Sequence, residues 1–233
     1  MPNVLFERII AQVPRKFWTH LRERQFAIYK QSVEISFGEF WTRAEALSLM
    51  PANRRALWES AQRQAAIASG LKPFDVPHVG DNCSCVTIRT AELVITGHFV
   101  DGPRQVPREA ESRKQNAALN RYFEYYTDER LLTRPLPKLD RKPVYINVLH
   151  GAHFPSLKSE NIELDETTCF LRVAVPAQDC RTYLFNWSVD DLLAEYSSRH
   201  DIQAQQELED KAHPKRKVAA PGERTKDKGR QAK

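Results

Sequence analysis

Long apolar runs and cysteine are both scarce in this chain of 233 residues. No window approaches the roughly 18 consecutive apolar residues that a membrane-spanning helix needs, and Glu7 and Arg8 interrupt the first apolar stretch before a signal peptide can develop. Four cysteines are too few for a disulfide scaffold in a chain of this length. We therefore expect a soluble, cytoplasmic protein with reduced thiols and no membrane partner.

Several catalytic motifs of fixed spacing are missing as well. The sequence holds no glycine-rich phosphate loop, no nucleophile elbow and no His-Glu-x-x-His helix. These absences exclude the enzyme classes that such motifs identify. Whether the protein is an enzyme of another kind stays open, because catalytic groups are recognised by their geometry rather than by their sequence position.

Charge is unevenly distributed along the chain, although the net charge is only +5. Residues 1–72 carry a net charge of +5, residues 73–210 of −7 and residues 211–233 of +7. Phosphate backbones are attracted to cationic surfaces and repelled by anionic ones. We therefore expect nucleic-acid contacts at the two cationic ends of the chain rather than in its acidic middle.

The C-terminal residues have the composition of an unfolded tail. From residue 211 onward, aromatic residues are missing and Val218 is the single branched apolar residue. Such a segment buries too little surface to offset the entropy lost on ordering. We predict a disordered cationic tail that binds phosphates without reading bases, through residues that include Lys215, Arg216 and Lys217. A solubilising role is the alternative.

The first 72 residues have the apolar spacing of helices. Apolar residues recur every three or four positions from Phe6 to Val13, and again through residues 15–31 after Pro14. Residues 36–39 fit a capping box, which predicts a helix over 37–49. Residues 50–53 combine a helix stop with a new N-cap and predict a second helix that ends at Gly70.

These two predicted helices and their turn are helix-turn-helix-like in outline. Arg54 and Arg55 fall in the first turn of the second helix, where the helix dipole disfavours cations. A groove-reading helix presents its N-terminal side chains to bases and phosphates, so Arg54, Arg55 and Arg63 are candidate DNA contacts. The alternative is a local surface ion pair between Arg55 and Glu59, four residues apart.

Beyond a breaker-rich stretch at residues 70–82, the apolar pattern changes to that of strands. One further helix is expected from Pro107 with an aromatic face, and another over 189–196 behind a Ser188 cap. The run at 143–151 is apolar on both sides and is predicted to be central. The segments expected to form strands are 83–89, 92–100, 143–151, 169–176 and 181–187.

The predicted fold class is α+β. We expect an N-terminal basic helical segment (1–72), an acidic core domain (73–200) and a polar linker with a disordered tail (201–233). The core domain is predicted to hold a mixed or antiparallel sheet of about four to five strands with a long helix packed on it.

A zinc site is one candidate for chemistry in the core domain. Cys83 and Cys85 are two apart on a predicted strand and therefore share a face, and His78 precedes them. Zinc accepts thiolate and imidazole ligands, and Cys169 or Cys180 is available as a fourth ligand. The spacing is not that of a zinc finger, so buried core thiols are the alternative and zinc is not supported as a cofactor.

His150 and His153 lie at the end of the predicted central strand. Two imidazoles at a strand end are candidates for a general base or, together with Asp165, for metal ligands. The sequence shows no partnered nucleophile to complete a mechanism. An ordinary turn at Gly151 is the alternative.

A magnesium-dependent nuclease needs carboxylates for the metal and a lysine beside the attacking water. Asp101 follows a predicted strand, but no acid-x-lysine pair lies on a neighbouring strand. The triplets at 140–142 and 209–211 have the right residue types and lie in a proline-rich loop and at the start of the tail. Magnesium is therefore not supported as a cofactor either.

The preferred functional hypothesis is a non-catalytic DNA-binding protein that contacts nucleic acid through its basic helical segment and cationic tail. One alternative is a hydrolase or metal-dependent nuclease with a site near His150 and His153. Another is a protein-interaction module whose acidic core binds a basic protein partner. Sequence preference and oligomeric state stay open.

Overall fold

The computed structural model describes residues 4–39, 42–77, 84–108, 110–123, 142–152 and 166–199. The chain divides into two compact units, Met1–Tyr196 and Ser197–Lys233. The predicted disordered tail, with Lys215, Arg216 and Lys217, lies outside the described residues and stays a prediction.

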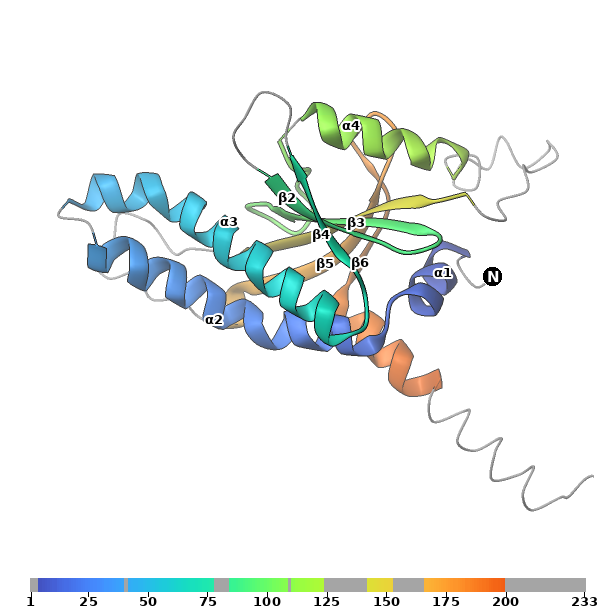
Figure 1. Cartoon of the computed structure of the whole chain (residues 1–233), viewed down its shortest axis with the longest axis horizontal. Helices are drawn as coiled ribbons and strands as arrows, with labels where there is room; N and C mark the ends of the chain where they lie inside the picture. The colour runs from blue at the N-terminus through green and yellow to red at the C-terminus, as the bar shows by residue number, and fades with distance from the viewer. Residues whose placement is uncertain are drawn as a thin grey trace, which may run out of the picture. The chain divides into compact units, whose positions relative to one another are not determined.

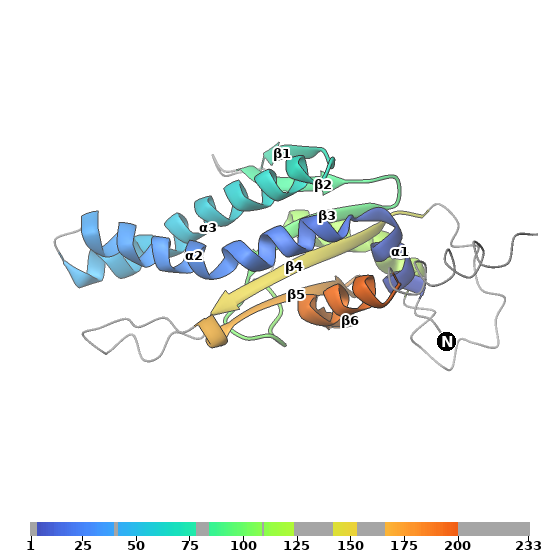
Figure 2. The same cartoon turned by 90° about the horizontal axis from the view of Figure 1, so that it is seen from below.

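Three helices form the first part of the chain. They are α1 (Val4–Gln12), α2 (Arg15–Glu39) and α3 (Arg43–Ala68). Pro14 separates α1 from α2, as predicted, because proline favours the start of a helix over its interior. Helices α2 and α3 lie side by side as a hairpin (Figure 2). None of the described helices is both long and apolar enough to cross a bilayer.

The predicted boundary between α2 and α3 is wrong. Helix α2 continues through the expected capping box, and the Ser36 hydroxyl donates to the Ser32 carbonyl at 2.7 Å inside the helix. The capping box instead forms at Thr42 and Glu45, each of which accepts from the backbone N–H of the other. Serine is a common N-cap residue, but its hydroxyl can also donate to a carbonyl inside a helix. The residue type of Ser36 therefore did not decide between the two.

The predicted turn at residues 50–53 is wrong too, because α3 runs through Pro51 without a break. An interior proline removes one helical hydrogen bond and costs about 3 kcal/mol. Buried side chains on both sides of Pro51, Met50 before it and Arg54 and Trp58 after it, hold the helix on the core. The helix-turn-helix-like interpretation therefore fails, and Arg54 lies in the middle of a helix.

Six strands form one mixed sheet in the order in which they occur along the chain. Strands β3 and β4 are parallel, and all other neighbours are antiparallel. The strands are β1 (Pro73–Pro77), β2 (Ser84–Arg89), β3 (Leu93–Phe99), β4 (Val144–Ala152), β5 (Cys169–Pro176) and β6 (Tyr183–Ser188).

These strands confirm the α+β class and the central position of β4, which is buried along its whole length. The sheet has one strand more than expected, because β1 lies in the breaker-rich stretch. Two prolines suit a strand at the edge of a sheet, where one side of the backbone needs no ladder partner.

The two faces of the sheet carry different helices (Figure 1). Helices α2 and α3 cover one face, and α4 (Glu111–Ala117) with the 3-10 helix η1 (Ala118–Tyr122) covers the other. The helix expected from Pro107 begins only at Glu111, because Ala110 still has extended backbone angles. It also tightens to a 3-10 helix after Ala117.

The core between the sheet and the N-terminal helices is continuous. Alternate residues of the strands, such as Ile88, Ile95 and Ile146, pack against Trp18 and Trp58 from the helices. The helical segment and the sheet thus belong to one compact unit, so the change of charge near residue 72 does not mark a change of core.

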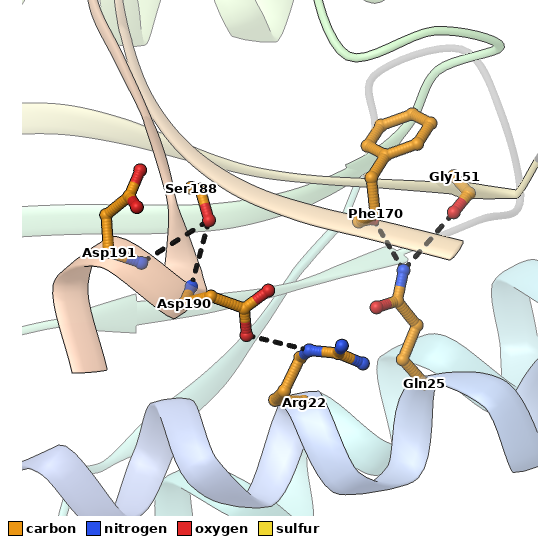
Figure 3. Close-up of polar contacts among 7 residues, drawn as sticks. All are labelled: Arg22, Gln25, Gly151, Phe170, Ser188, Asp190 and Asp191. Carbon is orange, nitrogen blue, oxygen red and sulfur yellow. Dashed lines mark hydrogen bonds and ion pairs between the residues drawn. The ribbon is translucent and has the colours of Figure 1, made fainter. Parts of the chain in front are cut away.

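Two polar contacts join α2 to the sheet and to the helix that begins after Ser188 (Figure 3). The Gln25 amide donates to the carbonyls of Gly151 and Phe170, at the ends of β4 and β5. Because these carbonyls are buried or partly buried, the amide satisfies acceptors that water does not reach. The second contact is the ion pair between Arg22 and Asp190 at 2.9 Å.

The predicted Ser188 cap is confirmed. Its hydroxyl accepts from the backbone N–H groups of Asp190 at 3.0 Å and Asp191 at 3.4 Å, and residues 189–199 are helical (Figure 3). Acids in the first turn of this helix also complement its dipole.

Candidate functional site

A cleft of about 850 Å³ lies beside β2, β3 and β4. Its walls come from α3, from these strands and from the segment that leads from Val100 into α4. This volume lies within the range of roughly 300–1,000 Å³ that is typical of small-molecule sites.

The cleft exists because β2 and β3 separate. Strand β2 pairs with β1 from Ser84 onward, but pairs with β3 only over Thr87–Arg89. Strand β3 pairs with β4 as far as Phe99. Among the described residues, the end of β3 therefore has no ladder partner on its β2 side. Side chains from both faces of the sheet reach the opening.

Arginine dominates the charge of this cleft. Among the described residues, five arginines and two carboxylates line it, which gives these side chains a formal charge of +3 with histidine neutral. Three of these arginines belong to the acidic segment 73–210, so the net charge of that segment does not describe its local surface. The charged lining residues are Arg54, Arg55, Arg89, Arg108, Arg113, Glu59 and Asp101.

The candidate DNA contacts of α3 occupy different environments. Arg55 lines the cleft and forms the predicted ion pair with Glu59 at 2.9 Å, while it also donates to the Ser84 carbonyl at 3.0 Å. Arg63 instead bonds Asp75 of β1 and does not line the cleft. The structure therefore brings Arg54 and Arg55 to the cleft but leaves Arg63 outside it.

Arg54 contributes charge from a buried position. It is only 5% exposed, and its guanidinium carbon lies 3.5 Å from the centre of the Phe99 ring. Burial lowers the pKa of Arg54, while Tyr29 and Asp101 act in the opposite direction. An arginine packed over an aromatic ring is held by cation–π attraction and has little freedom to follow a ligand.

His150 is the one predicted catalytic residue that the structure describes. Its ring stacks on Trp58 at 3.8 Å, and its Nδ1 lies 2.8 Å from the Tyr29 hydroxyl. Burial lowers the pKa of His150 well below its usual range, and the charge of Arg54 acts in the same direction. A neutral imidazole that is 2% exposed and held on both sides fits a structural role.

The other predicted catalytic and metal-binding residues are His153, Asp165, His78, Cys83 and Cys85. His153, Asp165, His78 and Cys83 lie outside the described residues. Cys85 is half-buried on β2, with its sulfur 3.8 Å from the Thr87 hydroxyl. In the described ranges, no group of three or more His, Cys, Asp or Glu side chains is arranged to hold a metal ion.

A polar cluster that the sequence analysis did not identify lies in the cleft wall. The Thr96 hydroxyl lies 2.7 Å from His98 Nε2 and 2.8 Å from the Tyr145 hydroxyl, and the last two atoms are 3.2 Å apart. Burial raises the pKa of Tyr145, so its phenol stays protonated. The sequence holds one signal for this cluster. Thr96 and His98 are two residues apart on a predicted strand, so their side chains lie on the same face.

Arg113 completes the inner wall from α4. Its guanidinium interacts electrostatically with the phenols of Tyr145 and Tyr183 and with the Cys180 thiol, and burial lowers its pKa. Comparison of the whole chain with protein-family models, curated proteins and solved structures found no match.

Proposed function

We propose that the protein binds nucleic acid and that the cleft between α3, β2–β4 and α4 holds its phosphates. The observation that carries this proposal is that five arginines and two carboxylates of the described part of the chain line one cleft. Guanidinium groups are suited to phosphate because their planar fork presents paired donors to the oxyanion.

The lining favours contact with the backbone over contact with bases. Its large aromatic side chains are occupied by the fold, since Trp58 and Tyr145 are buried and Phe99 packs on Arg54. The described part of the lining therefore offers no exposed ring for base stacking, which is typical of many single-strand binders. We expect affinity that depends strongly on salt and little on sequence.

A single strand fits this site better than a duplex does. The cleft is a pocket at the opening between two strands of a sheet, with a volume of about 850 Å³. Duplex readers instead place a helix or a ribbon in a groove. The continuous helix α3 uses its middle, not its N-terminus, to line the cleft, which differs from the docking of a recognition helix.

The first test is the binding of a fluorescent single-stranded oligonucleotide by the full chain at two salt concentrations. Arg108 lines the cleft and is exposed, whereas Arg104 is also exposed but lies outside the lining. We expect Arg108→Glu to weaken binding and to reduce the salt slope by about 0.7, the value for one phosphate contact in single strands.

Arg104→Glu is the matched control, because it makes the same change of charge in the same loop. Equal effects of the two substitutions would contradict a localised site and would favour a diffuse electrostatic attraction. Tighter binding of duplex than of single strand would contradict the preferred form of the ligand.

A further inference from the structure

Arg113 is a half-buried cation in the wall of the cleft. No residue in the described ranges forms a hydrogen bond or an ion pair with its guanidinium. The groups that act on it electrostatically are two phenols and a thiol. Removing a cation from water without a compensating partner is unfavourable, and an anion at this point would supply the partner.

The surroundings of Arg113 are rich in neutral donors. Ser112 and Asn116 line the same cleft from α4, while the hydroxyls of Tyr145 and Thr96 bond each other and His98 Nε2. Two hydroxyl contacts at His98 Nε2 hold the imidazole ring against the sheet. An oxyanion bound here would meet one guanidinium and several N–H or O–H groups, which is the set of partners that phosphate oxygens accept.

The cleft ends just beyond Arg113. One turn further along α4, Ala117 is buried in a small apolar cluster with Val94 and Tyr145. The Asn120 amide then donates to the carbonyls of Tyr145 at 3.0 Å and Pro176 at 2.8 Å. These contacts close the space between α4 and the sheet, so a strand that reaches Arg113 cannot continue past it.

We infer that Arg113, with His98 and the hydroxyl groups around it, forms a subsite for the phosphate monoester of a nucleotide, at the closed end of the proposed nucleic-acid cleft. This inference rests on the proposed function, which it extends from backbone binding to recognition of a terminal phosphate. The same chemistry is present at the end of a strand and in a free mononucleotide.

The test compares oligonucleotides of one sequence that carry a 5′-phosphate, a 3′-phosphate or two hydroxyl ends, together with a nucleoside monophosphate and its nucleoside. For the native chain, we expect one terminal phosphate to raise the affinity about tenfold, the effect of one added charge-assisted contact. Arg113→Gln should abolish this preference, and Arg113→Lys should restore part of it.

Arg108→Glu separates the test of the subsite from the test of the proposed function. It should weaken the binding of all the oligonucleotides, but the ratio of the affinities for phosphorylated and unphosphorylated ends should stay unchanged. Competition by the mononucleotide, but not by the nucleoside, would support the subsite and identify a free nucleotide as its ligand.

The results that would contradict the subsite differ from those that would contradict the cleft proposal. Binding of all oligonucleotides with no preference for a terminal phosphate would overturn the subsite and leave the cleft proposal standing. Absence of binding to every oligonucleotide would overturn the cleft proposal. If the mononucleotide still bound in an Arg113-dependent way, the subsite would then stand as a nucleotide site alone.

Discussion

The two faces of the sheet are built from the same strands and differ in almost everything else. On β3, Leu93 and Ile95 point to the N-terminal helices and enter the main core, while Thr96 and His98 point to the α4 side. Successive side chains of a strand point to opposite faces, so one sequence supplies both surfaces. The first face carries the main apolar core, and the second carries the polar cluster of Thr96, His98 and Tyr145. The cleft lies at the end of β3, where side chains of both faces line it.

This difference shows which parts of the chain serve stability and which are free for binding. The helix face buries large side chains such as Trp18 and Trp58, and this burial supplies most of the favourable free energy of folding. The cleft instead holds arginines that are exposed or half-buried, apart from the buried Arg54, and exposed charges add little to stability. Substitutions in the apolar core and at the exposed rim of the cleft should therefore separate stability from binding.

The largest expected effect comes from the helix face. Trp58→Ala should lower the free energy of unfolding by about 3–5 kcal/mol, because it empties a fully buried position and removes the ring that stacks on His150. Trp58→Phe should cost less, because the indole N–H has no partner in the described residues. Urea unfolding followed by circular dichroism measures both, and equal losses would contradict the assigned packing.

The next largest loss of stability is expected at Gly97, where α3 approaches β3 closely. A Cβ at Gly97 would lie 2.3 Å from Gln62 Oε1 and 2.4 Å from Trp58 Nε1, so Gly97→Ala should destabilise by about 1–3 kcal/mol. Gly102→Ala is the control, because its Cβ would have no neighbour nearer than 3.7 Å. Thermal unfolding of the two variants should differ clearly, and a harmless Gly97→Ala would show that the helix sits further from the strand.

A pH effect of intermediate size should arise from His150. Its folded-state pKa is depressed by burial, so the unfolded chain takes up a proton that the folded chain does not. Stability should therefore be fully present above the unfolded pKa of about 6.5 and should fall below it, by up to about 1.4 kcal/mol for each pH unit.

His150→Phe keeps an aromatic ring on Trp58 and removes the titration. The loss of unfolding free energy between pH 7 and pH 5 should be smaller in this variant than in the native chain. Equal losses in both proteins would mean that other groups cause the acid sensitivity.

Much of the fold could be predicted from the sequence where local pattern and tertiary packing agree. The alternation in residues 83–100, the doubly apolar run at 143–151 and the Ser188 cap all lead to the observed elements. The prediction failed where packing overrides a local signal. Pro51 is a stop by its chemistry, but buried side chains on both sides carry α3 through it.

The cleft was the least predictable part. Arg55, Arg89 and Arg113 are far apart in the sequence, and the last two lie among many acidic residues. Averaging charge over a segment hides such a cluster. The cluster also depends on the separation of β2 from β3, which is a property of strand register and not of any single residue.

The smallest expected effect is that of Arg113→Gln, which should raise the free energy of unfolding, whereas Trp58→Ala and Gly97→Ala lower it. Arg113→Gln removes a half-buried cation without a bonded partner in the described ranges, so the unfolding free energy should rise slightly, by about 0.5 kcal/mol. A residue kept at a cost to stability is typical of a binding site. Nucleoside monophosphate should raise the melting temperature of the native chain and not of the variant, by mass action on the folded state. A variant that melts below the native chain would show that Arg113 stabilises the fold and would remove this argument for its role in binding.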